Sequence, residues 1–116
     1  MTKNLKDMIG GWFIGDFEPS VWKTPAFEVA VKEYQAGDKE PKHLHKIAIE
    51  FTVIVRGKVL MNGTEYGEGD IIRIDTGKAT DFEALEDTIT VVVKRPSVED
   101  PSPAYPRAAV HPSPMS

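Results

Sequence analysis

Two of the three histidines in this chain, His43 and His45, are separated by a single residue. In an extended segment, residues i and i+2 project from the same side, so the two imidazole rings would lie side by side. A neutral imidazole binds Zn, Fe, Cu or Ni through one ring nitrogen. The pair is therefore half of a metal site, although an H-x-H pair by itself is more often a surface or hydrogen-bonded pair.

The residues around the two histidines form a longer pattern. Gly37 is followed after five residues by His43 and His45, then by Glu50 after four residues and Gly57 after six. This pattern resembles the first sequence motif of the cupin superfamily at every signature position. The resemblance implies that His43, His45 and Glu50 are metal ligands inside a β-barrel.

A second, weaker pattern lies further along the chain. The second cupin motif aligns here with both of its glycines, at Gly69 and Gly77. Asp75, Thr80 and Ala84 stand where that motif has proline, histidine and asparagine. The resemblance therefore places Thr80 in the pocket at the position of a missing fourth ligand.

The missing histidine leaves two interpretations open. In the first, the remaining ligands hold one divalent ion (Fe, Mn, Ni or Zn) as a 2-His-1-carboxylate face. Its open positions would then serve a small organic substrate in a reaction of the oxygenase or isomerase type. In the second, the barrel is a noncatalytic, even metal-free, module that binds a sugar or an organic acid. Retention of three ligands out of four favours the first, and the sequence identifies neither catalytic residues nor the substrate.

The position of Glu50 sets a condition on the backbone. It lies five positions after His45, an odd offset that puts it on the opposite face of an unbroken strand. We therefore expect a bend or bulge within residues 46–49 that turns the carboxylate back toward the histidines.

Other charged residues are candidates for roles beside the motif. Asp75 and Asp81 could replace the missing ligand, although Asp81 needs a bulge to reach the ion. Arg56, Lys58 and Arg73 could anchor a carboxylate or phosphate if they turn inward. The alternative for each is a solvated strand face, which is the usual position of a charged residue.

Short strands must position all of these residues. Apolar, β-branched runs occupy residues 27–32, 51–55, 71–74 and 88–93, separated by glycine-containing turns. The pair Asn62-Gly63 predicts a two-residue hairpin, because both central residues of a type I′ turn need positive φ. The pattern predicts an all-β fold, and the resemblance specifies a cupin-type β-barrel, a double-stranded β-helix or jelly roll. The aromatic residues expected in its core or cavity wall are Trp12, Tyr34, Phe51 and Phe82.

The chain length fits one domain. We expect the barrel to span residues 1–94, with its motifs in 27–94 and a helix at most within 2–9. Residues 95–116 contain six prolines and form a tail that cannot join a sheet interior. We expect residues after about Pro101, including His111, to add little to the core.

The composition limits the partners. The net charge of -4 gives no electrostatic basis for binding nucleic acid or an anionic membrane, and a small-molecule ligand is expected instead. The absence of cysteine excludes disulfides and thiolate metal sites. No apolar run is long enough to span a bilayer or to form a signal peptide, so the expected location is the cytoplasm. The family resemblance implies a homodimer.

Overall fold

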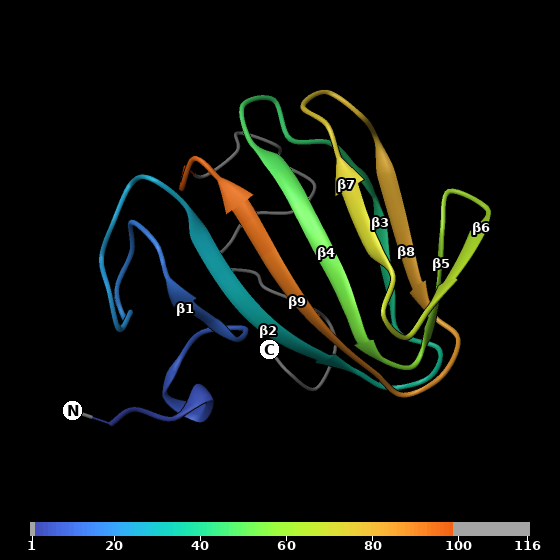
Figure 1. The fold of residues 1–116 in the computed structure, drawn as a ribbon, viewed down its shortest axis with the longest axis horizontal. Coiled ribbons are helices and arrows are strands. Elements are labelled where there is room, and N and C mark those ends of the chain that lie inside the picture. The colour runs from blue at the N-terminus through green and yellow to red at the C-terminus, as the bar shows by residue number, and fades with distance from the viewer. Residues whose placement is uncertain (1, 99–116) are drawn as a thin grey trace.

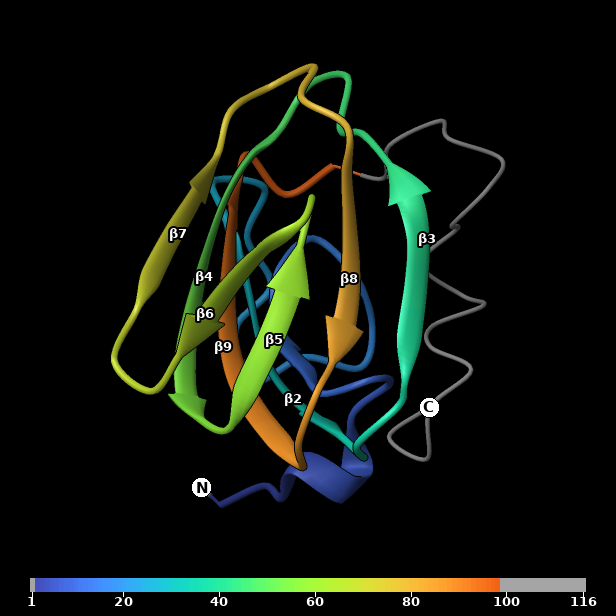
Figure 2. The same ribbon diagram turned by 90° about the vertical axis from the view of Figure 1, so that its right-hand side faces the viewer.

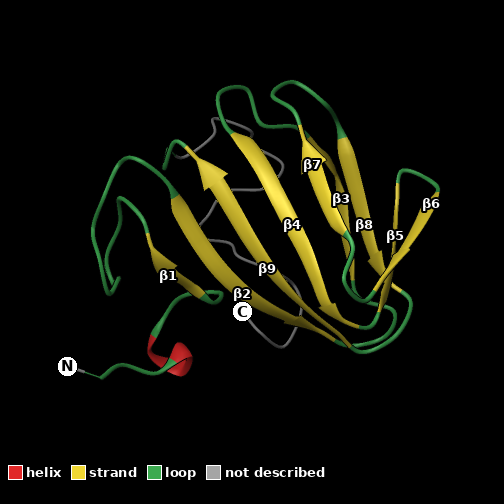
Figure 3. Ribbon diagram, in the orientation of Figure 1, coloured by secondary structure: helices red, strands yellow, loops and turns green. Residues whose placement is uncertain are grey.

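The computed structural model describes residues 2–98, in which nine strands are accompanied by one short 3-10 helix (Figure 3). The helix, η1, is only Leu5–Asp7 and is capped by the Asn4 side chain, which accepts a hydrogen bond from the Lys6 amide. The helical segment expected within residues 2–9 is thus a single turn. The strands are β1 (Trp12–Ile14), β2 (Glu28–Tyr34), β3 (Lys39–His43), β4 (Ile49–Arg56), β5 (Lys58–Met61), β6 (Thr64–Gly67), β7 (Ile71–Ile74), β8 (Thr80–Ala84) and β9 (Thr88–Arg95).

The strands form two sheets that face each other (Figures 1 and 2). One has the order β1-β2-β9-β4-β7 and the other the order β3-β8-β5-β6, and every neighbouring pair is antiparallel. Strands adjacent in the chain mostly lie in different sheets, as in a jelly roll. The expected all-β barrel of the double-stranded β-helix type is confirmed.

The predicted hairpin is also present. Met61 pairs with Thr64 at the end of β5 and the start of β6, which leaves Asn62 and Gly63 as the two-residue loop. Their φ angles are 49° and 81°, as a type I′ turn requires. The four apolar runs seen in the sequence correspond to β2, β4, β7 and β9, which supply most of the five-stranded sheet.

Apolar side chains from both sheets fill the barrel at the end where β5 begins. Ile54 and Val59 are fully buried there, and Tyr34 packs against Phe82 with 4.5 Å between ring centroids. A second cluster around Trp12, Ala30 and Val92 covers the β1 side of the sheet; together they make up the core.

Gly57, the last residue of the first motif, has a packing role. It has φ of 99°, and a side chain there would collide with Thr88 and the carbonyl of Asp87. Only glycine tolerates both the backbone angle and the close approach. The residue thus allows β4 to turn tightly into β5 against the start of β9.

Candidate metal centre and its surroundings

A bulge in β3 aims His43 into the barrel. Glu40 pairs with Phe82 and His43 pairs with Thr80, so three steps along β3 match two along β8. The extra residue falls beside Pro41, whose nitrogen cannot donate to the sheet. Residues directly opposite each other share a face. His43 therefore lies on the same face as Thr80, which is buried in the barrel.

The bend expected before Glu50 is present at Lys46 and Ile47. It brings two of the predicted ligands into contact, since His45 Nε2 lies 2.9 Å from Glu50 Oε1. Both side chains are largely shielded, with 11% and 15% of their surfaces exposed. The second carboxylate oxygen accepts a hydrogen bond from the Thr52 hydroxyl at 2.8 Å. The Glu50 carboxylate is thus held at both oxygens.

His43 stands next to this pair. Its ring is edge-on to that of His45, with 5.4 Å between centroids, and its Nδ1 lies 3.0 Å from the Pro41 carbonyl. A carbonyl only accepts hydrogen bonds, so Nδ1 carries the proton and Nε2 of the neutral ring carries the lone pair. Ligand histidines are commonly oriented in this way. Within residues 2–98, however, no three His, Cys, Asp or Glu side chains are already grouped closely enough to hold a metal ion.

The donor chemistry nevertheless fits a divalent ion. Two neighbouring ligands of a six-coordinate ion with bonds of about 2.1 Å lie about 3 Å apart. The distance of 2.9 Å between His45 Nε2 and Glu50 Oε1 matches that spacing. Thr80 adds a second indication, because its Oγ1 is buried and has no hydrogen-bond partner. Such a group normally has a partner in water, an ion or a ligand.

The pKa of Glu50 is lowered from its usual value of 4.5. Burial raises it, but the hydrogen bond and charge of His45, the Thr52 hydroxyl and the charge of Lys94 together outweigh burial. The carboxylate is therefore ionised at neutral pH, which is the form that binds a metal ion.

Three inward charges next to the site did not follow from the sequence patterns. Lys94 on β9 pairs in register with Glu28 on β2 and with Glu50 on β4. Its Nζ lies 3.5 Å from Glu28 Oε2, and the Glu28 side chain has no exposed surface. Lys32 is also buried, and its ammonium lies 5.0 Å from the centre of the Trp12 ring, against 5.7 Å for Lys94.

The alternation of inward and outward residues along each strand could have placed these lysines in the interior. Lys94 is in phase with Thr90 and Val92, and Lys32 is in phase with Ala30, all of which are buried. The strand expected at 88–93 stopped one residue short of Lys94.

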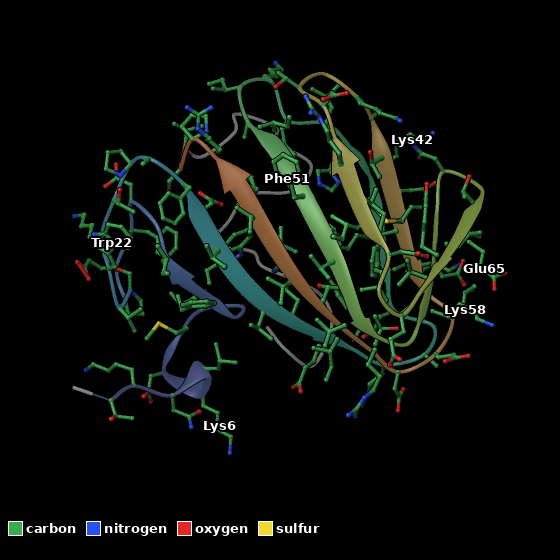
Figure 4. All side chains as sticks on the ribbon, viewed as in Figure 1. Lys6, Trp22, Lys42, Phe51, Lys58 and Glu65 are labelled. Carbon is green, nitrogen blue, oxygen red and sulfur yellow. The ribbon has the colours of Figure 1, made fainter. Side chains whose placement is uncertain are left out.

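The charged residues singled out as substrate anchors lie elsewhere. Arg73 is exposed and bonded to Asp75. Lys58 is half-exposed and lies beside Glu65 (Figure 4) and near Glu86. Arg56 is exposed as well.

Neither aspartate considered as a replacement ligand faces the histidines. Asp81 accepts a hydrogen bond from the Asn62 amide at the hairpin, while Asp75 bonds to Arg73. Phe51, an aromatic residue expected in the core or cavity wall, instead lies on the outer face of β4 beside Arg73.

A surface cleft of about 310 Å³ lies at the other end of β2 and β9, lined in part by Tyr34, Arg56 and Thr88. Thr88 is six residues from Lys94 along β9, or roughly 20 Å. None of the predicted ligands lines this cleft, so it is separate from the histidine site.

The chain matches no protein-family model and no curated protein. Its fold does match solved structures. An uncharacterized conserved protein with a double-stranded beta-helix domain from Klebsiella pneumoniae is 24% identical, with a TM-score of 0.61 over 66% of this chain and 69% of that chain. An RmlC-like cupin family protein from Methanocaldococcus jannaschii is 18% identical, with a TM-score of 0.59 over 64% and 73%. The fold is therefore that of the cupins.

A third similar structure is that of an enzyme. The DMSP lyase DddQ from Ruegeria pomeroyi is 23% identical, with a TM-score of 0.63 over 76% of this chain and 46% of that chain. At this level of identity the likeness describes the fold alone. Within the described residues, no helix is long and apolar enough to cross a membrane.

Proposed function

We propose that the barrel binds one divalent metal ion through His43, His45 and Glu50 and acts on a small organic substrate. The observation that carries this proposal is the convergence of the three predicted ligands, since the His43 and His45 ring centroids lie 5.4 Å apart and His45 contacts Glu50. A bound ion would supply a Lewis acid with open positions for a substrate. The cupin-fold neighbours, one of them named as a lyase, support a small-molecule function.

The residues of this chain have separable roles in the proposal. Glu50 supplies a carboxylate kept ionised by its neighbours, and Thr52 fixes its orientation. In the hydrogen bond to Glu50, His45 Nε2 carries a proton, because a carboxylate only accepts. That proton must move to Nδ1, by tautomerisation of the neutral ring, before Nε2 can become a ligand. Protons compete with the metal ion for the histidine nitrogens, so metal binding is expected to weaken as pH falls.

The charges beside the site are already paired. Lys94 lies 3.5 Å from Glu28, and Lys32 donates a hydrogen bond of 3.3 Å to the Gly10 carbonyl. They therefore do not select the charge of the substrate, and a sugar and an organic acid are both candidates.

The test is metal content after equilibrium dialysis against limiting Mn, Fe, Ni or Zn. The wild type should retain about one ion per chain, and His43→Ala or Glu50→Gln should lose most of it. His111→Ala, which changes the third histidine, is the matched control and should behave like the wild type. Thr80→His should tighten binding, because Thr80 pairs with His43 and faces the same interior.

A noncatalytic, metal-free module that binds a sugar or an organic acid is the second candidate. The direct hydrogen bond between His45 and Glu50 favours it, as does the lack of a preformed group of three donors in residues 2–98. If neither the wild type nor Thr80→His retains any metal, and organic acids bind equally well with chelator present, this second function replaces the first.

A further inference from the structure

The surface cleft at the end of β2 and β9 has charged groups of both signs in its walls. Its volume of about 310 Å³ is near the lower limit for a small-molecule site. Arg56 contributes a guanidinium group, while Glu33 and Asp87 contribute two carboxylates. Tyr34 and Ile89 contribute apolar surface. The cleft therefore offers a small ligand one cation, two anions and an apolar wall.

The strand pairing holds Arg56 and Glu33 on opposite sides of Ile89. The end of β2, the start of β9 and the end of β4 lie side by side there (Figure 1), and both charged residues pair in register with Ile89. Their backbones are therefore two strand spacings apart, or about 10 Å. Within residues 2–98, neither side chain has an ion-pair or hydrogen-bond partner. Opposite charges that line one cleft without meeting leave space for a ligand between them.

A bulge near the end of β4 sets the direction of Arg56. Ile54 pairs with Thr90, whereas Arg56, two positions further along β4, pairs with Ile89, only one position away on β9. In a regular strand Arg56 would share the inward face of Ile54, which is fully buried. It is instead exposed and lines the cleft. Bulges re-aim side chains in this way and are common next to functional sites.

Asp87 is held in place by its side chain and by its backbone. Its Oδ1 accepts a hydrogen bond of 2.9 Å from the Ala36 amide. Its carbonyl lies against Gly57, where a side chain would collide with it. In the described part of the chain, Asp87 Oδ2 has no hydrogen-bond partner. One carboxylate oxygen is therefore fixed, and the other is available to a donor group of a ligand.

We propose that this cleft binds an amino acid with a basic side chain, such as L-lysine. The carboxylate of the ligand would pair with Arg56, because a planar guanidinium matches a carboxylate. Its two ammonium groups would pair with Glu33 and Asp87, and its methylene chain would lie against Tyr34 and Ile89. One guanidinium and two carboxylates leave the cleft with one excess negative charge, which the excess positive charge of L-lysine balances. The inference is independent of the metal and of the proposed activity, because none of the predicted ligands lines the cleft.

The first experiment is a calorimetric titration of the chelator-treated full chain with L-lysine. The wild type should bind one L-lysine per chain. Arg56→Gln and Glu33→Gln should each weaken binding about tenfold, because each removes a charge-assisted contact. Neither variant removes a side-chain contact within residues 2–98, so both should unfold at the wild-type temperature. Arg73→Gln is the matched control, since Arg73 is an exposed arginine on the neighbouring strand β7, and it should bind L-lysine like the wild type.

An analogue then tests the role of Arg56. Cadaverine is L-lysine without its carboxylate, so it retains both ammonium groups and lacks the group that Arg56 would bind. The wild type should bind L-lysine about tenfold more tightly than cadaverine, and Arg56→Gln should bind the two about equally. A wild type that does not bind L-lysine, or an Arg56→Gln variant that keeps the preference, would overturn the proposal. Binding that is lost in His43→Ala and kept in Arg56→Gln would place the ligand in the barrel and overturn it as well.

Discussion

The inner face of β9 is more polar than its outer face. Toward the barrel the strand presents two threonines, a valine and Lys94, whereas outward it presents an isoleucine and two valines before Arg95. Polar groups inside a barrel cost free energy unless they are paired, so stability alone would favour the reverse arrangement. The polar inner face supports the ligand-binding interior proposed above.

Removing the charge at the inner end of β9 should have the largest effect. Lys94 lies 3.5 Å from Glu28, which is fully buried. Lys94→Met would leave a buried carboxylate without its cation, so we expect a loss of about 3–5 kcal/mol in the free energy of unfolding. Urea denaturation measures this loss in the free energy of unfolding. The control Lys78→Met, at an exposed turn, should change stability by less than about 0.5 kcal/mol. Equal stability of the two variants would show that the pair has no structural role.

Adjacent residues on β4 compare the two faces directly. Ile54 points inward and is fully buried, whereas Val55 points outward and is 46% exposed. Ile54→Ala should cost about 2–5 kcal/mol through lost burial and a cavity. Val55→Ala should cost less than about 0.5 kcal/mol. Urea denaturation of both variants measures the two costs, and a cost of Val55→Ala equal to that of Ile54→Ala would show that the outer face of β4 is packed as closely as the inner one.

The sequence predicted the parts of the site that depend on local rules. The odd offset between His45 and Glu50 predicted the bend at Lys46 and Ile47. The Asn62-Gly63 pair predicted a turn with positive φ at both residues. In each case the constraint lies within a few residues of the chain, where alternation and turn chemistry apply.

Features that depend on contacts between distant strands were less predictable. The bulge at Pro41 exists only in the pairing of β3 with β8, which joins residues about forty positions apart in the chain. The inward position of Lys94 depends on Glu28, 66 positions earlier. A rule that places charges at the surface fails there, because a distant carboxylate balances the buried ammonium.

The pH dependence of stability tests the inner face at Glu50. Its pKa is lowered in the folded chain, so its contribution is fully present above the unfolded value of 4.5 and is lost as pH falls through the folded value. In chelator-treated protein, Glu50→Gln should be less stable by about 1–3 kcal/mol at neutral pH, the range for hydrogen bonds to a charged group. That difference should shrink at acidic pH below 4.5. A difference constant from neutral to acidic pH would show that the carboxylate charge does not contribute.

The smallest expected effect is an increase in stability at Thr90. An increase distinguishes a role of the Thr90 hydroxyl in ligand binding from a role in the stability of the fold. Thr90 is 1% exposed, and its hydroxyl is buried in the interior with no hydrogen-bond partner. Thr90→Val removes the unsatisfied group with little change of shape, so the ligand-free protein should become more stable by about 1 kcal/mol. Val91→Thr, on the outer face of the same strand, is the matched control and should change stability by less than about 0.5 kcal/mol.

Thermal unfolding of both variants is measured with and without a small dicarboxylate such as succinate. If the interior binds an organic acid, succinate should stabilise the wild type more than Thr90→Val, because only the wild type retains the hydroxyl. A Thr90→Val variant that is less stable than the wild type without ligand would mean that water already satisfies the hydroxyl, and that the polar inner face of β9 is structural at this position.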